Sequence, residues 1–468
     1  MRDFRTRIER TLRLSISFYC SAYNYFTVKV VIVGGGAAGM SAASRVRRLD
    51  PNAQVTVLEG TKMVSHAPCG IPYFIEGFFN DESLFMAYTP QFFLESRKIN
   101  VVTEVRVDEI DTGSRMVEGN GKQGRIREDY DYLVYATGAL PKIPQVPGVE
   151  GENVFEIHHP AHASEIRKRL WGKSRVAVVG GGVLGLEMVE ALSNVGKKVI
   201  MIHRSARLLN RITDEDVSSI VEREVRGKGV EVRLGEELEE IRNNGRLVVT
   251  SGGKYEVDAV VVATGVTPNV NLVKEKLRIG ETGAVWTDRK MKTSNPYVYA
   301  AGDAAESTNL ITGRPDWEPF GPVANKMGYV AGTNIAGSSM TFPGVAGSVI
   351  TKFYDVFVGK TGLTENEAKR AGLNPVSSFI RTRSRARYYP GGSEIYLKLI
   401  AESSTLRLLG AQIVGREEVL GRINVIASLL LKRGIVEDLF FTELGYLPAI
   451  SQVWDPLVIA ARKLMRGD

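Results

Sequence analysis

Cysteine is scarce in this chain of 468 residues, which holds only Cys20 and Cys69. Two cysteines cannot build a disulfide framework or a multi-cysteine metal site, so neither is expected. Histidine is also rare: its five positions are 66, 158, 159, 162 and 203, all in the first half of the sequence. Any chemistry in the second half must therefore use other side chains.

Long apolar runs and concentrated charge are missing as well. No run approaches the roughly 20 apolar residues that a membrane span needs, so no membrane partner is predicted. Of the net charge of +7, residues 1–26 carry +3, as five Arg against Asp3 and Glu9, and the other residues hold the remaining +4. That excess is not gathered into a basic tract. It favours anionic cofactors over nucleic acid as partners, although a diffuse DNA-binding face stays open.

The N-terminal segment loosely matches a signal peptide, because residues 12–26 are apolar and aromatic after an Arg-rich start. It lacks a convincing small-residue cleavage site, and a buried-strand pattern begins almost at once, at Val28. We therefore predict that residues 1–26 are a dispensable extension and that the protein is cytoplasmic.

The composition that remains, 44% hydrophobic and 24% charged, is that of a soluble globular protein. The length suits two or three domains. Within it, a strand, a glycine-rich loop, a helix and a second strand occur twice. The first copy is strand 28–33, loop 34–39, helix 40–49 and strand 54–58; the second is strand 175–179, loop 180–185, a helix through Leu192 and strand 198–202.

The first loop has Gly34, Gly36 and Gly39 in the Gly-x-Gly-x-x-Gly pattern, and the next strand ends at Glu59. The first glycine makes a tight turn, the second lets a pyrophosphate approach the backbone, and the third lets helix and strand pack closely. The pyrophosphate then lies at a helix N-terminus, where Glu59 accepts from ribose hydroxyls. Two complete copies in one chain favour two dinucleotide sites over ligand-free turns.

The second loop, with Gly180, Gly182 and Gly185, is followed by a strand that ends in His203-Arg204. A carboxylate at that strand end would hold an NAD ribose and repel a 2′-phosphate, whereas a guanidinium and an imidazole accommodate the phosphate. NADPH is therefore predicted here, with NADH tolerated. The alternative is an Arg204 that is merely solvated at a strand end.

Three later turns follow apolar strands: strand 132–135 leads into Ala136-Thr137-Gly138, strand 259–262 into Ala263-Thr264-Gly265, and strand 298–301 into Gly302-Asp303. From residue 347 onward, alternating strands such as 394–399 and 406–414 precede a helix over 423–432, which predicts a separate α+β domain.

Over residues 28–468 this set of motifs resembles the pyridine nucleotide–disulfide oxidoreductases. The resemblance implies an α/β fold with two Rossmann-like dinucleotide-binding domains and a C-terminal α+β dimerisation domain. FAD would bind to residues 27–150 and 271–345, and NAD(P)H to residues 151–270. Residues 346–468 would form a homodimer, and hydride would pass from the nicotinamide to the flavin.

The resemblance also implies roles for single residues. Asp303 would contact the ribityl or phosphate region of FAD, the Ala-Thr-Gly turns would line the domain junctions, and Glu187 would lie near the nicotinamide. The implied cofactor-binding residues are Gly34, Gly36, Ala37, Ala38, Gly39, Glu59, Ala136, Thr137, Gly138, Gly180, Gly182, Gly185, Glu187, His203, Arg204, Thr264, Gly265, Gly302 and Asp303.

Cys69 stands alone where glutathione-reductase-like members have two cysteines four residues apart, and the C-terminal His–Glu pair of those members is also missing. Cys69 must therefore cycle as a sulfenic acid or as a mixed disulfide with a small thiol.

The sequence around Cys69 resembles the single-cysteine branch of coenzyme A disulfide reductases, NADH oxidases and peroxidases, and polysulfide or sulfur reductases. It reads Ser65-His66-Ala67-Pro68-Cys69-Gly70-Ile71-Pro72-Tyr73. If residues 70–74 open a helix, its dipole and the flavin would favour the thiolate. A free Cys that is only a small buried hydrophobe is the alternative.

The C-terminal segment favours the coenzyme A branch. Its motifs Arg387-Tyr388-Tyr389-Pro390-Gly391, Tyr446-Leu447-Pro448 and Trp454-Asp455-Pro456 resemble coenzyme A disulfide reductase signatures, in which a tyrosine pair of the partner subunit reaches the active-site cysteine. A phenol can hold a thiolate by a hydrogen bond and can protonate a leaving thiol. Tyr388 and Tyr446 match that pair, with Tyr389 as an alternative.

A groove for coenzyme A (CoA) is implied by Arg45 and Arg48, which match positions that face the CoA nucleotide, and by Lys62 and Ser65 near the cysteine. Two positions depart from the branch: Pro68 replaces the usual Asn before the cysteine, and His66 replaces the usual Phe after the serine. These departures leave the preferred substrate open. His66 is a candidate proton carrier or an ordinary loop residue.

The sequence thus predicts an FAD-dependent NAD(P)H oxidoreductase that reduces CoA disulfide, CoA persulfide or polysulfide through a mixed disulfide of Cys69 with CoA. The alternative enzyme is an NADH oxidase or peroxidase that cycles Cys69 through sulfenic acid. A flavin-bearing redox sensor with negligible turnover is a third hypothesis.

Overall fold

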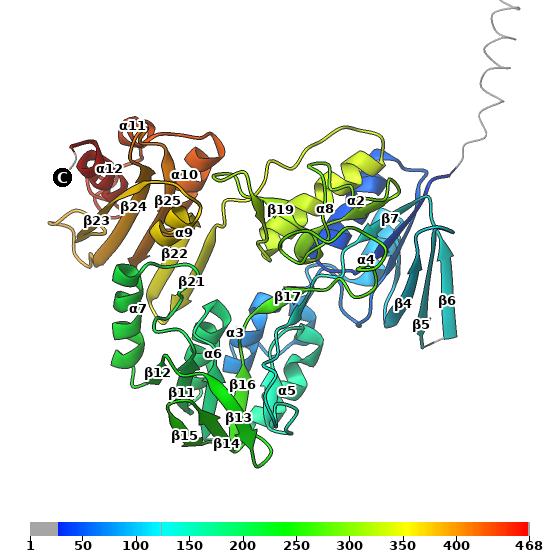
Figure 1. The fold of residues 1–468 in the computed structure, drawn as a ribbon, viewed down its shortest axis with the longest axis horizontal. Helices are drawn as coiled ribbons and strands as arrows, with labels where there is room; N and C mark the ends of the chain where they lie inside the picture. Colours follow the sequence, from blue (N-terminus) through cyan, green and yellow to red (C-terminus); the bar gives the residue numbers. More distant parts are fainter. Residues whose placement is uncertain (1–26, 123, 467–468) are drawn as a thin grey trace, which may run out of the picture.

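A computed structural model of the chain describes residues 27–122 and 124–466. The predictions for residues 1–26, including Cys20, lie outside the described residues. The described chain forms three bodies: a C-terminal domain at the upper left of Figure 1, a domain built on the first glycine loop at the upper right, and one built on the second glycine loop below them.

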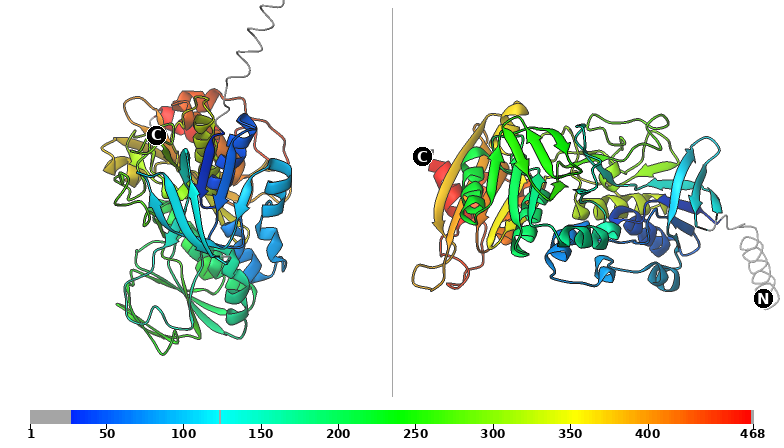
Figure 2. Two further views of the ribbon diagram at one scale, coloured as in Figure 1. Left: turned by 90° about the vertical axis from the view of Figure 1, so that its right-hand side faces the viewer. Right: turned by 90° about the horizontal axis from the view of Figure 1, so that it is seen from below.

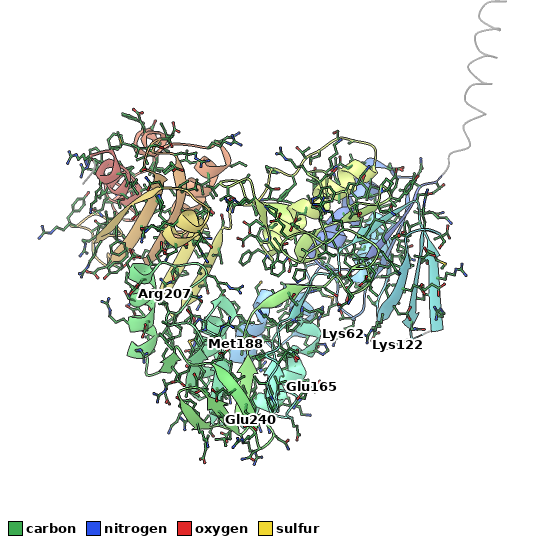
Figure 3. All side chains as sticks on the ribbon, in the orientation of Figure 1. Lys62, Lys122, Glu165, Met188, Arg207 and Glu240 are labelled. Atoms are coloured by element: carbon green, nitrogen blue, oxygen red, sulfur yellow. The ribbon has the colours of Figure 1, made fainter. Side chains whose placement is uncertain are left out.

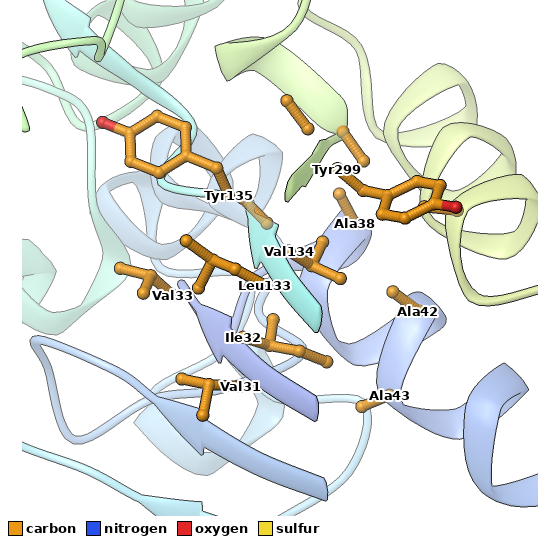
Figure 4. Close-up of a cluster of buried hydrophobic side chains, with 14 of the residues drawn as sticks. Val31, Ile32, Val33, Ala38, Ala42, Ala43, Leu133, Val134, Tyr135 and Tyr299 are labelled. Carbon is orange, nitrogen blue, oxygen red and sulfur yellow. The ribbon is translucent and has the colours of Figure 1, made fainter. Parts of the chain in front are cut away.

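The first sheet is five-stranded and parallel, in the order β18-β7-β1-β2-β3. Its strands are β1 (Lys29–Val33), β2 (Gln54–Leu58), β3 (Asn100–Val102), β7 (Tyr132–Tyr135) and β18 (Val298–Ala300). Strand β18 enters this sheet after the chain has completed the second one, so the first domain is made of two separate stretches. Helix α2 (Ala37–Leu49) packs on the sheet, where its alanines lie over Ile32 and Val134 (Figure 4). The helix begins at Ala37 rather than at the predicted Met40, because Gly36 serves as its N-cap.

The second sheet repeats this arrangement in the order β12-β11-β10-β16-β9. Its strands are β9 (Val154–Glu156), β10 (Arg175–Val179), β11 (Lys198–His203), β12 (Glu231–Leu234) and β16 (Ala259–Val262). Helices α5 (Ala163–Trp171), α6 (Val183–Asn194) and α7 (Glu215–Gly227) accompany it. Each domain also carries a small antiparallel sheet: β4 (Val105–Asp111), β5 (Met116–Gly121) and β6 (Gly124–Asp129) in the first, and β13 (Leu238–Arg242), β14 (Leu247–Thr250) and β15 (Gly253–Glu256) in the second.

The two nucleotide domains are joined by a pair of short strands. Strand β8 (Ala139–Pro141) follows the first Ala-Thr-Gly turn, β17 (Val266–Pro268) follows the second, and they pair antiparallel. Helix α3 (Ile71–Glu76), although it comes from the first stretch, is buried in the same hydrophobic cluster as Val176 and Met188 of the second domain. The segment that follows Cys69 is therefore held by the second domain.

The C-terminal domain has a five-stranded antiparallel sheet, in the order β21-β22-β25-β24-β23. Its strands are β21 (Val349–Phe353), β22 (Val356–Gly362), β23 (Pro375–Arg383), β24 (Glu394–Glu402) and β25 (Leu408–Gly415), and its helices are α9 (Glu365–Arg370), α10 (Val419–Leu431), α11 (Val436–Phe441) and α12 (Pro456–Arg466). The predicted fold class is confirmed. Within the described residues, no helix is long and apolar enough to cross a membrane.

Candidate active site

The first glycine loop has the geometry that a pyrophosphate requires. Gly34 has a φ of +106°, and a Cβ on it would lie 2.1 Å from the Ala136 oxygen; a Cβ on Gly39 would lie 1.9 Å from the Gly34 oxygen. Both positions are closed to any side chain. A Cβ on Gly36, by contrast, would meet only the Cε1 of His66, at 3.7 Å. The middle glycine therefore opens onto free space at the start of α2, where a phosphate can approach the backbone.

The second loop repeats these constraints. A Cβ on Gly180 would lie 2.2 Å from the Ala263 oxygen, a Cβ on Gly185 would lie 2.0 Å from the Gly180 oxygen, and a Cβ on Gly182 would meet nothing within 4 Å. Gly182 is the N-cap of α6, as Gly36 is of α2. The chain thus has two matching dinucleotide cradles, and the residues of both fit the predicted cofactors.

The strand ends beside the two loops differ in charge. The Oε2 of Glu59 accepts a hydrogen bond from the Gly35 amide at 2.8 Å, and the Nδ1 of His203 accepts one from the Gly181 amide at 3.1 Å. Burial lowers the pKa of His203, so the imidazole is neutral, and its Nε2 lies 3.2 Å from the Oδ1 of Asn210. His203 therefore preserves the acceptor without a negative charge. Both of its nitrogens thus have partners within the described residues.

Arg204 is the cation that remains at this strand end. Its side chain is 75% exposed, and its guanidinium lies 3.9 Å from the Glu237 carboxylate. This weak surface contact leaves the guanidinium available to an incoming anion. The structure thus separates two neighbouring side chains that the sequence had given the same role.

The later turns lie where the domains meet. The Thr137 hydroxyl donates to the Asn269 carbonyl at 2.9 Å, and the Thr264 hydroxyl donates to the Lys142 carbonyl. The turn Gly302–Ala304 that carries Asp303 rests on α2, because a Cβ on Gly302 would lie 2.8 Å from the Cβ of Ala38. Burial raises the pKa of Asp303 to about 6. Asp303 therefore lies beside the first glycine loop.

Cys69 lies in a 3₁₀ turn, Pro68–Gly70, directly before α3, and its thiol is free and exposed. One turn later, burial together with the nearby Glu187 and Glu190 raises the pKa of Tyr73. Glu187 and Glu190 belong to α6, which packs against α3. Cys69 thus lies directly before α3, and α3 packs against α6, the helix that begins at the second glycine loop.

Strand β21 of the C-terminal domain contacts α6 through two side chains. Thr351 donates its hydroxyl hydrogen to the Oε1 of Glu187 at 2.9 Å, and Lys352 forms an ion pair with Glu190. Burial raises the pKa of Glu187. Sequence reasoning missed Tyr73 and Lys352. Tyr73 has a signal, its place in the Cys-Gly-x-Pro-Tyr stretch, but nothing in the sequence links Lys352 to α6.

A cavity of about 220 Å³ lies between α2, α4 (Pro90–Arg97) and α8 (Gly321–Ile335), and three predicted CoA residues line it: Arg45, Arg48 and Ser65. The guanidinium of Arg45 lies 4.2 Å above the ring of Tyr329. The other lining residues are Ala37, Met40, Ser41, Ser44, Tyr88, Phe93, Arg97, Asn325 and Tyr329. Sequence reasoning missed Arg97, Tyr88 and Tyr329, because they come from distant segments with no recognisable motif.

Lys62, which was also predicted to bind CoA, is not among the residues that line this cavity. Its Nζ pairs with Glu82 at 2.9 Å, and Glu82 in turn meets Ser164 at the start of α5. Figure 3 shows Lys62 on the side of the molecule that also carries Glu165 of α5. Proximity in sequence to Cys69 therefore did not bring this lysine to the cavity.

Tyr388 and Tyr446 do come together: their hydroxyl oxygens are 3.2 Å apart, and the side chains are 76% and 46% exposed. The hydrogen bond with Tyr388 raises the pKa of Tyr446. The centre of the Tyr389 ring lies 5.8 Å from the Arg385 guanidinium. Tyr388 lies in the connection between β23 and β24, at the outer end of the C-terminal domain and away from α3 (Figures 1 and 2). The connection that carries Tyr388 is therefore separated from the helix that follows Cys69 in the same chain.

Comparison with known proteins identifies the family of this chain. Residues 28–319 match the pyridine nucleotide-disulphide oxidoreductase family, and residues 348–457 match its dimerisation domain. The chain belongs to this family. It is an NAD(P)H-dependent flavoprotein oxidoreductase, as the sequence predicted.

Three relatives in this family span nearly all of the chain. A protein of Pyrococcus horikoshii named NAD(P)H coenzyme A polysulfide/persulfide reductase is 48% identical over 93% of this chain and 98% of its own length. A Methanocaldococcus jannaschii protein named NADH oxidase is 36% identical over 94% of this chain and 99% of its own length. The structure of an NAD-dependent persulfide reductase from A. fulgidus is 38% identical, with a TM-score of 0.91, over 94% of this chain and 83% of that one.

Proposed function

We propose that this flavoprotein uses NAD(P)H to reduce CoA persulfide, and CoA disulfide as a related substrate, through Cys69. The observation that carries the proposal is the cavity between α2, α4 and α8, which gathers Arg45, Arg48 and Arg97. A thiol with several phosphates needs such a cluster, since guanidinium groups bind phosphate oxygens in charge-assisted pairs.

Two further features connect the cavity to the cysteine. Ser65 lines the cavity and lies four residues before Cys69, with its backbone held by a hydrogen bond from its amide to the Gly35 carbonyl at 2.8 Å. The rings of Tyr329 and Tyr88 lie under Arg45 and Arg97, so the cations are fixed by aromatic faces. A CoA molecule with its phosphates on these arginines would extend its thiol end toward Cys69.

Because Cys69 has no second cysteine beside it, its sulfur must form a disulfide with the substrate. Its thiolate attacks the CoA-bonded sulfur of the substrate, forms Cys69–S–S–CoA, and releases hydrosulfide from a persulfide or CoA thiolate from a disulfide. Bound FAD would supply the two electrons of NAD(P)H that break this mixed disulfide into the Cys69 thiolate and free CoA. The residues of the first glycine loop, with Glu59 and Asp303, would hold the FAD.

The proton for the leaving thiol is proposed to come from Tyr446 and Tyr388 of a partner subunit. The two hydroxyls form a pair on exposed side chains. The β23–β24 connection that carries Tyr388 lies away from α3, the helix that follows Cys69 (Figure 1). Residues 348–457 match a dimerisation domain, which supports a homodimer. A phenol can act as a general acid, and the second half of the chain has no histidine that could take this role.

The decisive experiment follows NADPH consumption under argon with CoA persulfide, CoA disulfide or polysulfide as the acceptor. Replacing Arg45 or Arg48 with Ala should raise the KM for the CoA substrates about ten- to hundredfold per lost phosphate contact, and should leave the KM for CoA-free polysulfide unchanged. Lys62→Ala is the matched control, because Lys62 lies near Cys69 in sequence but outside the cavity.

The NADH oxidase named among the relatives supplies the rival outcome. If oxygen consumes NADPH as fast as any sulfur acceptor, and the arginine variants change nothing, Cys69 cycles through sulfenic acid instead. Mass spectrometry of the small molecule released from the purified protein by reductant adds an independent measurement. Released CoA supports the mixed disulfide, and its absence after incubation with CoA disulfide overturns it.

A further inference from the structure

One ion pair ties the C-terminal domain to the helix that begins at the second glycine loop. It joins the Nζ of Lys352 on β21 to the Oε1 of Glu190 on α6. The side chain of Glu190 is 7% exposed and that of Lys352 is 25% exposed, so solvent screens this pair less than an exposed one. Removing one partner of a buried pair is costly, because it leaves the other charge unpaired. The pair therefore constrains where α6 lies relative to β21.

The constrained part of α6 is close to the end that carries the glycine loop. Gly182, which opens onto free space, is the N-cap of this helix, and Glu190 lies about 12 Å further along the axis, at about 1.5 Å per residue. Glu187 lies about one turn nearer the loop and on the same face of the helix as Glu190. It accepts a hydrogen bond from the Thr351 hydroxyl at 2.9 Å. Two neighbouring residues of β21 thus hold two successive turns of α6, so a shift of these turns would move the loop at the start of the helix.

The ammonium group of Lys352 also faces helix α3. Its Nζ lies 5.9 Å from the centre of the Tyr73 ring. The two helices are linked as well, since the side-chain amide of Asn194 on α6 donates to the Oε1 of Glu76 on α3. Cys69 lies directly before α3. Lys352 is therefore placed where the nucleotide helix, the helix that follows the cysteine, and the C-terminal domain meet.

The balance of charge at this meeting point depends on Lys352. Burial raises the pKa of Glu187 and that of Glu76, and the nearby Glu190 acts in the same direction. Lys352 acts against this rise at both carboxyls. Without the lysine, the carboxyl groups on α6 and α3 would face one another with less compensation, and like charges repel. The lysine thus helps to keep the two helices packed together.

We propose that Lys352 is a positioning residue for hydride transfer, which acts through Glu190 to hold the glycine-loop end of α6 against α3. A nucleotide bound at the second glycine loop then meets the segment that follows Cys69 in one fixed arrangement. The reaction that this arrangement assists moves a hydride, which is a proton with two electrons, from the reduced nicotinamide to the flavin and leaves oxidised nucleotide. The inference rests on the proposed function, in which NAD(P)H is the reductant, and on its binding at the second glycine loop.

Stopped-flow reduction of the flavin by NADPH tests this step by itself, because it needs no sulfur acceptor. In Lys352→Met the rate constant at saturating NADPH should fall about ten- to hundredfold, since a misplacement of about 1 Å can cost about 10²-fold. Arg416→Met is the matched control. Arg416 joins the same two domains, but it does so through Glu224 of α7, at 2.9 Å, instead of through α6. Its flavin should be reduced at the natural rate.

Two further variants make the test specific to the ion pair. Glu190→Gln should slow flavin reduction as much as Lys352→Met does, and the double variant should be no slower, because both changes remove the same interaction. Lys352→Arg keeps the positive charge and should keep most of the rate. The comparison of Glu190→Gln with Lys352→Arg still decides if Lys352→Met fails to fold, as judged by circular dichroism.

Amide hydrogen exchange of the protein without nucleotide adds a measurement that does not depend on turnover. The amides of α6 and α3 should exchange faster in Lys352→Met than in the natural protein, because their local packing opens more often. Those of α7 should be unchanged. In Arg416→Met the faster exchange should appear at α7 instead.

Three results separate the possible failures. Natural rate constants in folded Lys352→Met and Glu190→Gln would overturn the proposal. An equal loss of rate in Arg416→Met would overturn it too, since the ion pairs would then only brace the domains. If neither NADPH nor NADH reduces the flavin of the natural protein, the proposed function fails first.

Discussion

At the end of the second strand of each nucleotide domain, one side chain accepts a hydrogen bond from the amide of the residue that follows the first motif glycine, Gly35 in one domain and Gly181 in the other. Glu59 does so with a carboxylate, and His203 does so with a neutral imidazole. The geometry is conserved between the two domains while the charge changes. A carboxylate repels a 2′-phosphate and an imidazole does not, so the prediction of NADPH at the second site is consistent with this arrangement of the loop.

Arg204→Glu tests which residue recognises the phosphate. The KM for NADPH should rise about ten- to hundredfold, because a charge-assisted contact of about 1.5–3 kcal/mol is lost. The KM for NADH should change little, so the same variant provides its own control in steady-state assays. An equal change with both nucleotides would mean that Arg204 is not the phosphate contact.

At the scale of elements, a buried polar network joins the second nucleotide domain to the C-terminal domain. Asp214, the N-cap of α7, accepts from the Glu365 amide at the start of α9 at 2.9 Å and from the Gln412 amide group at 2.6 Å. The Nζ of Lys398 on β24 lies 2.8 Å from Asp216, 3.1 Å from Glu365 and 3.5 Å from Asp214. The ammonium group of Lys398 thus forms ion pairs with three carboxylates from two domains.

Lys398→Met should therefore destabilise the protein by about 3–5 kcal/mol, the usual cost of leaving buried carboxylates without their cation. Lys369→Met is the control: Lys369 pairs with the same Glu365 on the surface of α9, and its loss should cost only about 0.3–0.5 kcal/mol. Urea unfolding of both variants measures the difference. Equal small losses would show that the network contributes little.

The same network predicts an acid-labile contact between the domains. Burial acts to raise the pKa of Glu365, but hydrogen bonds from Lys369, Lys398 and Ser377 lower it to about 2. A carboxyl with a depressed pKa contributes stability above its ordinary value and loses it as the pH falls. Stability should therefore decline between about pH 4.5 and pH 2, and less so in Lys398→Met. Thermal unfolding across this range, with parallel slopes for both proteins, would contradict the prediction.

At the scale of the whole molecule, the active site is proposed to be shared between two chains. Tyr446→Phe should leave flavin reduction by NADPH intact and slow thiol release about 10²–10⁴-fold, the usual range for general acid catalysis. Stopped-flow measurement of the two half-reactions separates these effects. A variant that releases thiol at the natural rate would move the acid role to water or another group.

Mixed dimers test the shared site directly. Cys69→Ser chains and Tyr446→Phe chains are each expected to be inactive, but a mixed dimer has one site with both the cysteine and the tyrosine intact. Activity should partly return when the chains exchange, as monitored by mass-tagged subunits. Demonstrated exchange without recovered activity would place the tyrosine pair outside the reaction.

A chain that starts at Val28 tests the N-terminal extension. The first strand begins at Lys29, and terminal residues outside a sheet usually tolerate removal. The shortened protein should retain FAD and full turnover with CoA persulfide. Loss of flavin, measured by absorbance, would assign residues 1–26 a role in the fold.

Local patterns were enough to predict the two nucleotide sheets and their glycine loops. A buried parallel strand is a continuous apolar run, and a strand-to-helix turn against a phosphate requires glycine at fixed spacing, so both can be recognised within a few neighbouring residues. Strands 54–58, 132–135, 175–179 and 259–262 end in the structure where the sequence predicted. The fold class follows from such segments, because the structure of each one can be predicted from its own local sequence.

Only the tertiary structure decided which distant side chains meet. Arg97 and Tyr329 join Arg45 at one cavity, Lys62 turns to Glu82 instead, and Lys352 reaches Glu190 across a domain boundary. These encounters depend on how helices and domains pack, which no spacing in the sequence encodes. Side-chain direction was equally out of reach: His203 and Arg204 are adjacent in the chain, yet one faces the loop and the other faces solvent, since successive residues at a strand end point to opposite sides.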